Sequence, residues 1–402
     1  MATNNNDKTL NVPPLRFPEF SGEWEEEQLD SIATLSKGIG ISKEQLSEDG
    51  EPCILYGELY TKYKSEIIKQ VESKTDIDCS KLKRSKANDV IIPCSGETAV
   101  DIATARCVPF DNILLGGDLN IISLHKYDGA FMSYQLNGKR KYDIARVAQG
   151  VSVVHLYGEH LKAIKTYNPS LPEQQKIAKL LSLIDERIAT QNKIIEKLQS
   201  LIKGLSQQLL SSENDWILYR LDDLAQIKSG YSGIQVSYQT PYKVSRIETI
   251  SKHCIDIQRI GYVEFIPESY KLNVGNILFS NINSVQYIGN TAYLDKDYGL
   301  YHGMNLLRII PNTTIVRPRF LHLLLCTDWA INHFQTICNK AVSQASINQT
   351  ALGKSRYPIP PMSVQQQICS MFELTERKLG NEQEYISCLQ QQKRYLLQEM
   401  FI

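Results

Sequence analysis

The residues that could carry out catalysis do not form a catalytic pattern in this sequence. Gly353-Lys354-Ser355 ends like a phosphate-binding loop, but Asn348 stands where that motif requires its first glycine. The seven histidines form no His-Glu-x-x-His motif and no ligand spacing with cysteine. No nucleophile has a recognisable base partner. We therefore expect a chain that is not an enzyme by itself and that binds no metal and no cofactor.

Polar loops that follow short β-type runs are better candidates for a functional surface. Runs at 53–57, 89–93 and 120–124 recur in the second half at 275–280 and 305–310, and polar turns follow them. Asn, Gln, Ser, Thr, Tyr and Glu side chains supply the donors and acceptors that read base edges, although solvated turns have the same composition. The candidates for base contact are Tyr56, Glu58, Tyr60, Ser95, Glu97, Thr98, Asn281, Asn283, Ser284, Gln286 and Tyr287.

Three short basic runs, at 81–84, 139–141 and 317–319, could position phosphates, or could be solvated faces. The candidates for phosphate contact are Lys83, Arg84, Lys139, Arg140, Lys141, Arg317 and Arg319. Lys and Arg together number 44, as do Asp and Glu, so the formal net charge is zero. This balance excludes a histone-like, purely electrostatic binder, and any nucleic-acid site must be a local patch made by folding.

Length and composition indicate two or three ordinary globular domains. The chain has 402 residues, of which 42% are hydrophobic and 22% are charged. The sequence contains no apolar stretch long enough for a transmembrane helix, and its first residues lack the order of a signal peptide. Nine cysteines without a Cys-x-x-Cys pair favour free thiols. We therefore expect a cytoplasmic protein that has no membrane partner.

The chain repeats itself once. Five positions from Trp24 to Gly38 are identical to those from Trp216 to Gly230 at an offset of 192 residues. A second set matches at an offset of 191, from Val151-Ser152 with Val342-Ser343 through Gln174-Gln175 with Gln365-Gln366 to Gln207 with Gln398. Chance similarity of two amphipathic helices would not explain the Trp–Leu–Asp–Ala–Gly run. The period is too long for a solenoid and indicates a duplicated domain-plus-helix cassette.

The helical part of each cassette has the spacing of a coiled-coil seam. Apolar residues recur every 3 or 4 positions after Pro172, with a polar interruption at the same place in both copies, Gln191 in the first and Glu382 in the second. Thr375 and Lys393 are further polar positions on the seam of the second copy. A long helix with an apolar stripe needs a partner, and the other copy is the nearest one; the alternative is that each helix packs on its own domain. The expected seam is Ile177, Leu181, Ile184, Ile188, Ile195, Leu198, Ile202, Leu205, Ile368, Phe372, Leu379, Ile386, Leu389 and Leu396. Leu180, Ile194 and Leu201 flank this seam and could form a docking face for another protein or simply widen the seam.

These observations predict an α+β fold. It consists of two similar mixed α/β domains separated by two long antiparallel coiled-coil helices, with pseudo-twofold symmetry. The expected segments are an N-terminal tail (1–16), a first mixed domain (17–168), a first spacer helix (169–212), a second mixed domain (213–361) and a second spacer helix (362–402).

The sequence resembles the specificity subunit of type I restriction–modification systems over nearly its whole length. The resemblance rests on the twofold cassette, on the Trp–(x4)–Leu–Asp…Gly opening of each domain, and on Leu171-Pro-Glu-Gln-Gln-Lys-Ile177-Ala at the start of the first helix. Tyr56-Gly-Glu-Leu-Tyr-Thr61 and Ile92-Pro-Cys-Ser-Gly-Glu-Thr98 agree with it. The second copy, Met362-Ser-Val-Gln-Gln-Gln-Ile368, lacks the Pro-Glu, which puts its helix start in doubt.

The resemblance implies a protein that chooses a DNA site and leaves the chemistry to its partners. Each recognition domain would read one half of an asymmetric bipartite target in double-stranded DNA, and the helices would set the unread gap. Two methyltransferase (modification) subunits, which bind S-adenosylmethionine and methylate adenine, would dock on the helices. A motor–nuclease (restriction) subunit that uses ATP and Mg would complete the complex.

Two other functions remain as alternatives. A coiled-coil scaffold or adaptor with duplicated protein-binding domains would show no sequence-selective retention on DNA. An orphan catalytic methyltransferase would need a complete methyl-donor site, which we do not find in the sequence.

Overall fold

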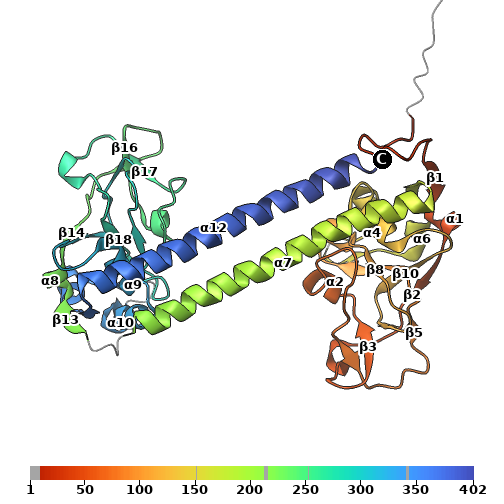
Figure 1. Cartoon of the computed structure of the whole chain (residues 1–402), viewed down its shortest axis with the longest axis horizontal. Coiled ribbons are helices and arrows are strands. Elements are labelled where there is room, and N and C mark those ends of the chain that lie inside the picture. Colours follow the sequence, from red (N-terminus) through yellow and green to blue (C-terminus); the bar gives the residue numbers. More distant parts are fainter. Residues whose placement is uncertain (1–9, 151, 212–215, 252, 341–343) are drawn as a thin grey trace, which may run out of the picture. The chain divides into compact units, whose positions relative to one another are not determined.

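The computed structural model describes residues 10–150, 152–211, 216–251, 253–340 and 344–402. The chain divides into two compact units. Unit 1 consists of residues 1–193 and 383–402, and unit 2 consists of residues 194–382. Each unit therefore combines one mixed domain with part of each long helix (Figure 1).

A four-stranded antiparallel sheet with the same strand order forms the centre of each unit. In unit 1 the order is β2 (Ala33–Lys37), β10 (Leu119–Leu124), β6 (Asp89–Pro93) and β8 (Arg106–Val108). In unit 2 it is β14 (Ala225–Ser229), β22 (Leu307–Pro311), β18 (Ile277–Phe279) and β20 (Thr291–Tyr293). The register pairs Ile121 with Ile91 in one sheet and Ile309 with Ile277 in the other. The duplication seen in the sequence is thus a duplication of topology.

The central strands form because their apolar runs are covered on both faces. In β6, Val90, Ile91 and Ile92 are all fully buried, which is why this strand is a continuous hydrophobic run rather than an alternating one. Val90 and Ile92 belong to one apolar cluster and Ile91 to another on the opposite face. A sheet buried on both faces can hold the loops at its strand ends in fixed positions.

Smaller sheets also correspond between the units. A two-stranded ribbon opens and closes each domain: β1 (Glu25–Gln28) with β12 (Lys165–Asn168), and β13 (Ile217–Arg220) with β25 (Arg356–Ile359). A second four-stranded sheet contains β4 (Lys74–Thr75), β3 (Glu51–Ile54), β9 (Leu114–Leu115) and β5 (Lys83–Arg84) in unit 1. Its counterpart in unit 2 contains β15 (Gln235–Val236), β17 (Gly261–Val263), β16 (Tyr242–Val244) and β21 (Leu300–Tyr301).

Short helices complete the domains. In unit 1 they are α1 (Leu29–Ile32), η1 (Lys43–Gln45), α2 (Glu58–Thr61), α3 (Ala99–Ile102), α4 (Gly129–Asn137), α5 (Lys141–Val147) and α6 (Gly158–Lys162). In unit 2 they are α8 (Leu221–Leu224), η2 (Ile247–Ile250), η3 (Glu268–Tyr270), α9 (Pro318–Leu325), α10 (Asp328–Ile337) and α11 (Gln349–Gly353).

One tryptophan in each unit packs against a helix that adjoins the spacer helices. The ring centroids of Trp24 and Phe131 of α4 are 5.8 Å apart, and those of Trp216 and Phe320 of α9 are 6.3 Å apart. Phe131 belongs to a cluster with residues of the first spacer helix, whereas its neighbour Met132 packs with the central sheet. Helix α4 therefore joins the domain to the helix pair, and the repeated tryptophan is part of that junction.

The repeated glutamines of the helix starts make the same hydrogen bonds in both units. In unit 1 the amide nitrogen of Gln174 donates to the carbonyl of Pro169 (2.7 Å), and its oxygen accepts from the backbone N–H of Asp128 (2.9 Å). In unit 2 Gln365 donates to Pro360 (2.9 Å) and accepts from the residue that precedes α9 (2.8 Å). Both glutamine side chains are buried. Each satisfies backbone groups that would otherwise be buried without a partner, which explains their recurrence.

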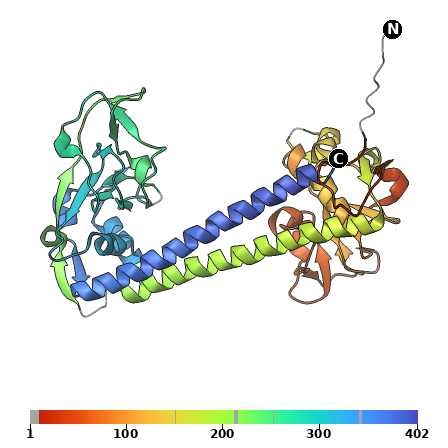
Figure 2. The same cartoon turned by 45° about the horizontal axis from the view of Figure 1, so that its top comes forward.

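The spacer helices are α7 (Leu171–Leu209) and α12 (Met362–Glu399), labelled in Figure 1 and seen again in Figure 2. In unit 1 the start of α7 packs on the end of α12, since Ile177 and Leu181 share a cluster with Leu396. In unit 2 the end of α7 packs on the start of α12, since Ile202 packs against the cluster that contains Phe372. The pairing is antiparallel in each unit, and every position of the expected seam is buried or half-buried.

The fold class is confirmed as α+β with two similar domains and two long antiparallel helices. The second helix begins at Met362 without the Pro-Glu of the first copy. The first spacer helix begins at Leu171, which places Pro172 in its first turn. Part of the expected N-terminal tail is ordered on the helix ends: the backbone N–H of Leu15 donates to Glu399 O, and Arg16 pairs with Glu173. Val151, Val342 and Ser343, which matched in the sequence, lie outside the described residues.

The described residues contain no helix that is long and apolar enough to cross a bilayer. All nine cysteines are free thiols. Within the described ranges, no group of three or more His, Cys, Asp or Glu side chains is arranged to hold a metal ion.

Candidate nucleic-acid interface

In unit 1 the polar loop after the central strand β6 is held by a short strand pair. Strand β7 (Ser95–Gly96) pairs with β11 (Val154–His155). The Tyr60 hydroxyl donates to the Ser95 carbonyl (3.1 Å), and the Ser95 hydroxyl lies 3.4 Å from His155 Nδ1. A Cβ added at Gly96 would lie 3.0 Å from the Tyr60 hydroxyl oxygen, so this position favours glycine. The structure thus brings Tyr60 and Ser95 together, as two of the predicted site residues.

The same loop presents polar side chains to solvent. Glu97 and Thr98 are exposed, as is Tyr56. The Thr98 hydroxyl accepts from the backbone N–H of Asp101 and so caps α3. Because the cap fixes the backbone here, the Glu97 side chain projects from a rigid turn. Glu97 is therefore well placed for a ligand, whereas Thr98 already has a structural partner.

Sequence reasoning missed an aromatic group beside this loop. The rings of His155 and Tyr157 stack with centroids 6.1 Å apart, and Tyr157 meets His160 edge-on at 5.6 Å. Tyr157 is 50% exposed. Exposed aromatic rings can stack on bases or sugars. No motif in the sequence marks these residues, because only the β7–β11 pairing brings them beside Ser95.

Glu58, predicted to contact bases, is buried and used inside the domain. Its Oε2 accepts from the backbone N–H of Leu55 (2.9 Å), and its Oε1 accepts from the Ser73 hydroxyl and pairs with Lys62 (2.7 Å). Only 6% of Glu58 is exposed. A carboxylate with both oxygens bonded and almost no exposure has no atom free for a base edge, so this part of the prediction fails. The β-run predicted through Tyr56 ends at Ile54, and Glu58 begins α2 instead.

In unit 2 the corresponding polar loop is held in the same way. Strand β19 (Ile282–Asn283) pairs with β24 (Ala345–Ser346), which also pairs with β23 (Asn339–Lys340). The Asn283 amide donates to the Ser280 hydroxyl (3.1 Å), and its oxygen accepts from the Ser284 backbone (2.8 Å). The side chains of Asn283 and Ser280 therefore support the turn.

Beyond that support, the unit 2 loop presents Gln286 and Tyr287 to solvent, and Tyr287 is 50% exposed. Asn281 differs from them, because its Oδ1 is buried without a hydrogen-bond partner in the described part of the chain. Its amide nitrogen lies 3.5 Å from the Ile347 carbonyl. Exposed and partly satisfied amides on a fixed turn are suited to hydrogen bonding with base edges.

Among the described residues, three of the seven basic candidates are engaged in ion pairs within their own units, namely Arg84, Arg140 and Arg319. Arg84 forms a two-pronged pair with Glu51. Arg140 donates to the Ile402 carbonyl (2.9 Å) and lies over the Tyr167 ring. Lys83 is half-buried, as are Lys141 and Arg317, and Lys139 is exposed. Burial lowers the pKa of Lys141.

Arg319 pairs with Glu376 of α12 and donates to His322 Nδ1 (2.9 Å). Of the seven basic candidates, Lys139 is the one best placed for a phosphate, since it is exposed and lies outside every ion pair found among the described residues. Arg84 is used inside the mixed domain of unit 1, whereas Arg319 ties the domain of unit 2 to α12.

Both spacer helices expose apolar residues away from the seam. Leu183 is 43% exposed, and Leu374, its match at an offset of 191 in the second copy, is 56% exposed. Ile194 and its match Tyr385 are also exposed, as is Leu201. Leu180, by contrast, packs against the apolar cluster of unit 1. Large apolar side chains at equivalent positions of both copies are typical of a docking surface.

Two copies of one mixed domain, each with a polar loop on a rigid sheet and each joined to a long helix, define a protein built from an internal duplication. The chain belongs to the family described as the type I restriction modification DNA specificity domain, which matches residues 21–200 and 213–389. The two matches correspond to the two cassettes, and they confirm the resemblance expected from the sequence.

Relatives with this description share moderate sequence identity. The putative type I restriction enzyme MjaX specificity subunit of Methanocaldococcus jannaschii is 38% identical over 193 residues, which is 46% of this chain and 45% of that protein. The type I restriction enzyme MjaVIII specificity subunit of the same organism is 24% identical over 313 residues, 69% of this chain and 70% of that protein. The chain thus spans about half the length of the first relative.

Solved structures share the fold at lower identity. The S subunit of a type I restriction-modification system from M. genitalium has a TM-score of 0.64 at 17% identity and covers 97% of this chain and 99% of its own. A chain from a study of complex assembly and conformational transition of the type I R-M system has a TM-score of 0.58 at 14% identity, covering 96% and 99%. At these identities the comparison supports the fold alone.

Proposed function

We propose that this chain is the DNA sequence-recognition subunit of a type I restriction–modification complex. Each mixed domain reads one half of a bipartite, asymmetric target in double-stranded DNA, and the paired helices fix the gap between the halves. The observation that carries this proposal is the repetition of a whole unit: the same sheet order, the same held polar loop and the same glutamine-clamped helix start occur twice.

In this proposal the chain performs no catalysis of its own. Two methyltransferase subunits that bind S-adenosylmethionine dock on the exposed apolar faces of α7 and α12 and methylate adenine. A motor–nuclease subunit that uses ATP and Mg joins them in the cytoplasm. The exposed Leu183 and Leu374 support the docking step, because they are matched in the two copies and the same partner could bind at both.

Base contact falls to the exposed residues of the held loops. In unit 1 the loop supplies Glu97, with Tyr56 of the turn between β3 and α2 as a second contact and Tyr157 as a stacking group. In unit 2 the loop supplies Gln286 and Tyr287. Each well-formed base contact is worth about 1–3 kcal/mol of discrimination. The loops differ in residue type between the units, as two unlike half-sites require.

The test is to co-express the chain with its methyltransferase partner and to map methylated adenines across a genome. We expect one motif with two half-sites and a fixed gap. Exchange of residues 17–168 for another recognition domain should change one half-site and leave the other and the gap intact. A motif without a gap, or a change in both halves, would contradict the proposal. Absence of any sequence-selective methylation would favour a protein-binding scaffold.

A further inference from the structure

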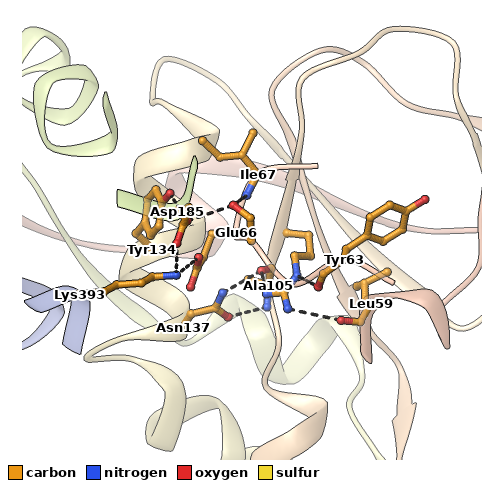
Figure 3. A network of polar contacts seen from close by, with 11 residues as sticks. Leu59, Tyr63, Glu66, Ile67, Ala105, Tyr134, Asn137, Asp185 and Lys393 are labelled. Atoms are coloured by element: carbon orange, nitrogen blue, oxygen red, sulfur yellow. Dashed lines mark hydrogen bonds and ion pairs between the residues drawn. The ribbon is translucent and has the colours of Figure 1, made fainter. Parts of the chain in front are cut away.

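A cluster of buried charges joins three segments of unit 1 that are far apart in the sequence (Figure 3). The ammonium of Lys393, on α12, lies 2.6 Å from Asp185 Oδ1 of α7 and 2.6 Å from Glu66 Oε2 of the mixed domain. The three side chains are 15%, 6% and 9% exposed. One cation thus ties both spacer helices to the recognition domain.

Neighbouring groups complete the cluster. The hydroxyls of Tyr134 (2.7 Å) and Ser65 (3.0 Å) both donate to Asp185 Oδ2. Arg106, also buried, donates to the carbonyls of Tyr63 (3.0 Å) and Ala105 (2.9 Å). Two positive and two negative groups therefore balance inside the unit. Backbone carbonyls direct Arg106, and the two hydroxyls direct Asp185.

The electrostatics of the cluster depend on all its members. Burial raises the pKa of Glu66, although Lys393 opposes that rise. Burial also lowers the pKa of Lys393, but Glu66 and Asp185 outweigh this and leave it raised. A buried ion cluster adds little net stability over apolar packing, yet it penalises any arrangement that separates its partners. Its physical effect is to fix one geometry.

Unit 2 has no such cluster among its described residues. The residue that matches Lys393 at an offset of 191 is Ile202, and the one that matches Asp185 is Glu376, which pairs with Arg319. Ile202 and Glu376 line a cavity of about 1310 Å³ between the helices and the domain of unit 2. In unit 1 the place that corresponds to this cavity is occupied by the segment that contains Glu66 and Ile67, because Ile67 packs against the apolar cluster that contains Leu181.

We propose that the Lys393–Asp185–Glu66 cluster positions the first recognition domain on the spacer helices and so keeps its half-site at one distance from the other. This inference rests on the proposed function. The three residues are positioning residues, since they are buried and cannot touch DNA. One base pair advances the duplex by about 3.4 Å. A domain that rocked by that distance would read the same half-site at a gap one base pair longer or shorter.

The test uses the full chain co-expressed with methyltransferase subunits, with the gap length of methylated sites as the readout. The E66Q/D185N/K393M variant removes all three charges and nearly keeps side-chain volumes. We expect the ratio of methylation at altered gaps to methylation at the native gap to rise roughly tenfold or more, since a displacement of about 1 Å can change rates about 100-fold. Both half-site sequences should stay unchanged.

The matched control is K69M/E186Q, which removes an exposed ion pair between the same domain and α7. We expect it to keep the native gap, because exposed pairs contribute little. If the triple variant does not fold, S65A/Y134F removes both hydroxyl donors to Asp185 and leaves the charges in place. It should relax the gap in the same direction by a smaller factor.

The outcomes separate this inference from the proposed function. Loss of methylation without a change in gap, in a folded variant, would give the cluster only a role in stability and would overturn the inference. Methylation at the native gap alone in both E66Q/D185N/K393M and S65A/Y134F, when both variants are folded, would also overturn the inference. If the wild-type chain itself yields no bipartite motif, the proposed function fails first.

Discussion

Two histidines of unit 2 are buried in their neutral form. Burial lowers the pKa of His322 to about 3 and that of His302 to about 4. The His302 Nε2–H donates to the Leu306 carbonyl (2.9 Å), while His322 Nδ1 must accept from Arg319, because a guanidinium can only donate. A depressed histidine pKa means that the unfolded chain binds protons more readily than the folded one. The two histidines therefore leave the free energy of unfolding undiminished above about pH 6.5. They lower it as the pH drops towards their pKa values in the folded state.

We predict that each of these histidines costs unit 2 about 2 kcal/mol at pH 5 relative to neutral pH, from about 1.4 kcal/mol per pH unit. The H302Q variant keeps a nitrogen donor for the Leu306 carbonyl but has no group that titrates in this pH range. It should therefore remove about half of the combined loss of stability from the two histidines. Urea unfolding of a W24F background, in which the remaining tryptophans report on unit 2, measures the effect from pH 7.5 to pH 4.5. An identical acid slope in H302Q and its parent would refute the assignment.

Single residues also mark the limit of sequence reasoning. Lys393 fell on the expected seam, but its partner Glu66 is 327 positions away and lies in no motif. Glu58 was expected to read bases because it stood in a polar run, yet the fold turns it towards Ser73 and Lys62. Residue type predicts the capacity for an interaction, while the partner depends on contacts that only the folded chain creates.

At the scale of elements, the long helices were predictable almost to the residue. Their signal is a repeated 3–4 spacing over ten positions, which few other structures produce. The strands at 89–93 and 120–124 were also found, because apolar runs bounded by turns are a strong local signal. Apart from β3, which overlaps the run predicted at 53–57, the strands of the second sheet in each domain were missed, because strands of two to four residues are too short to show a period.

The exposed faces of the helices give a prediction at this scale. The L183E/L374E variant should keep its thermal stability within about 0.5 kcal/mol, because both side chains are surface residues. It should no longer retain methyltransferase subunits in a pull-down, because a charge would be buried in each docking site. E186Q/R377Q, which changes exposed charges on the same helices, serves as the comparison. Retention equal to wild type would place the docking surface elsewhere.

At the scale of the molecule, net neutrality bears on the proposed DNA binding. A chain with equal numbers of acidic and basic residues, in which Arg84 and Arg319 are held in internal ion pairs, can neutralise few phosphates. Under the proposed function, affinity comes from base contacts together with partners that enclose the duplex.

We predict weak binding of target DNA by the isolated chain and tight binding by the complex with methyltransferase subunits. The dependence of log Kd on log salt should also be steeper for the complex, because more phosphates are contacted. Gel-shift titrations at several salt concentrations, with and without the partner, measure both. Tight, salt-insensitive binding by the chain alone would contradict this account, and scrambled DNA provides the control for sequence selectivity.

Unit 1 is built from two separate stretches of the chain and unit 2 from one, so the two units complete their folding in a fixed order during synthesis. Unit 2 is one continuous stretch, whereas unit 1 needs residues 383–402, which are synthesised after unit 2. Until they emerge, Trp24 and Phe131 lack the ring of Phe401, and Glu66 and Asp185 face each other without their cation. Unit 1, which begins first, therefore completes its folding after unit 2, and a chain cut short before residue 383 would be left with an incomplete unit 1 beside a nearly complete unit 2.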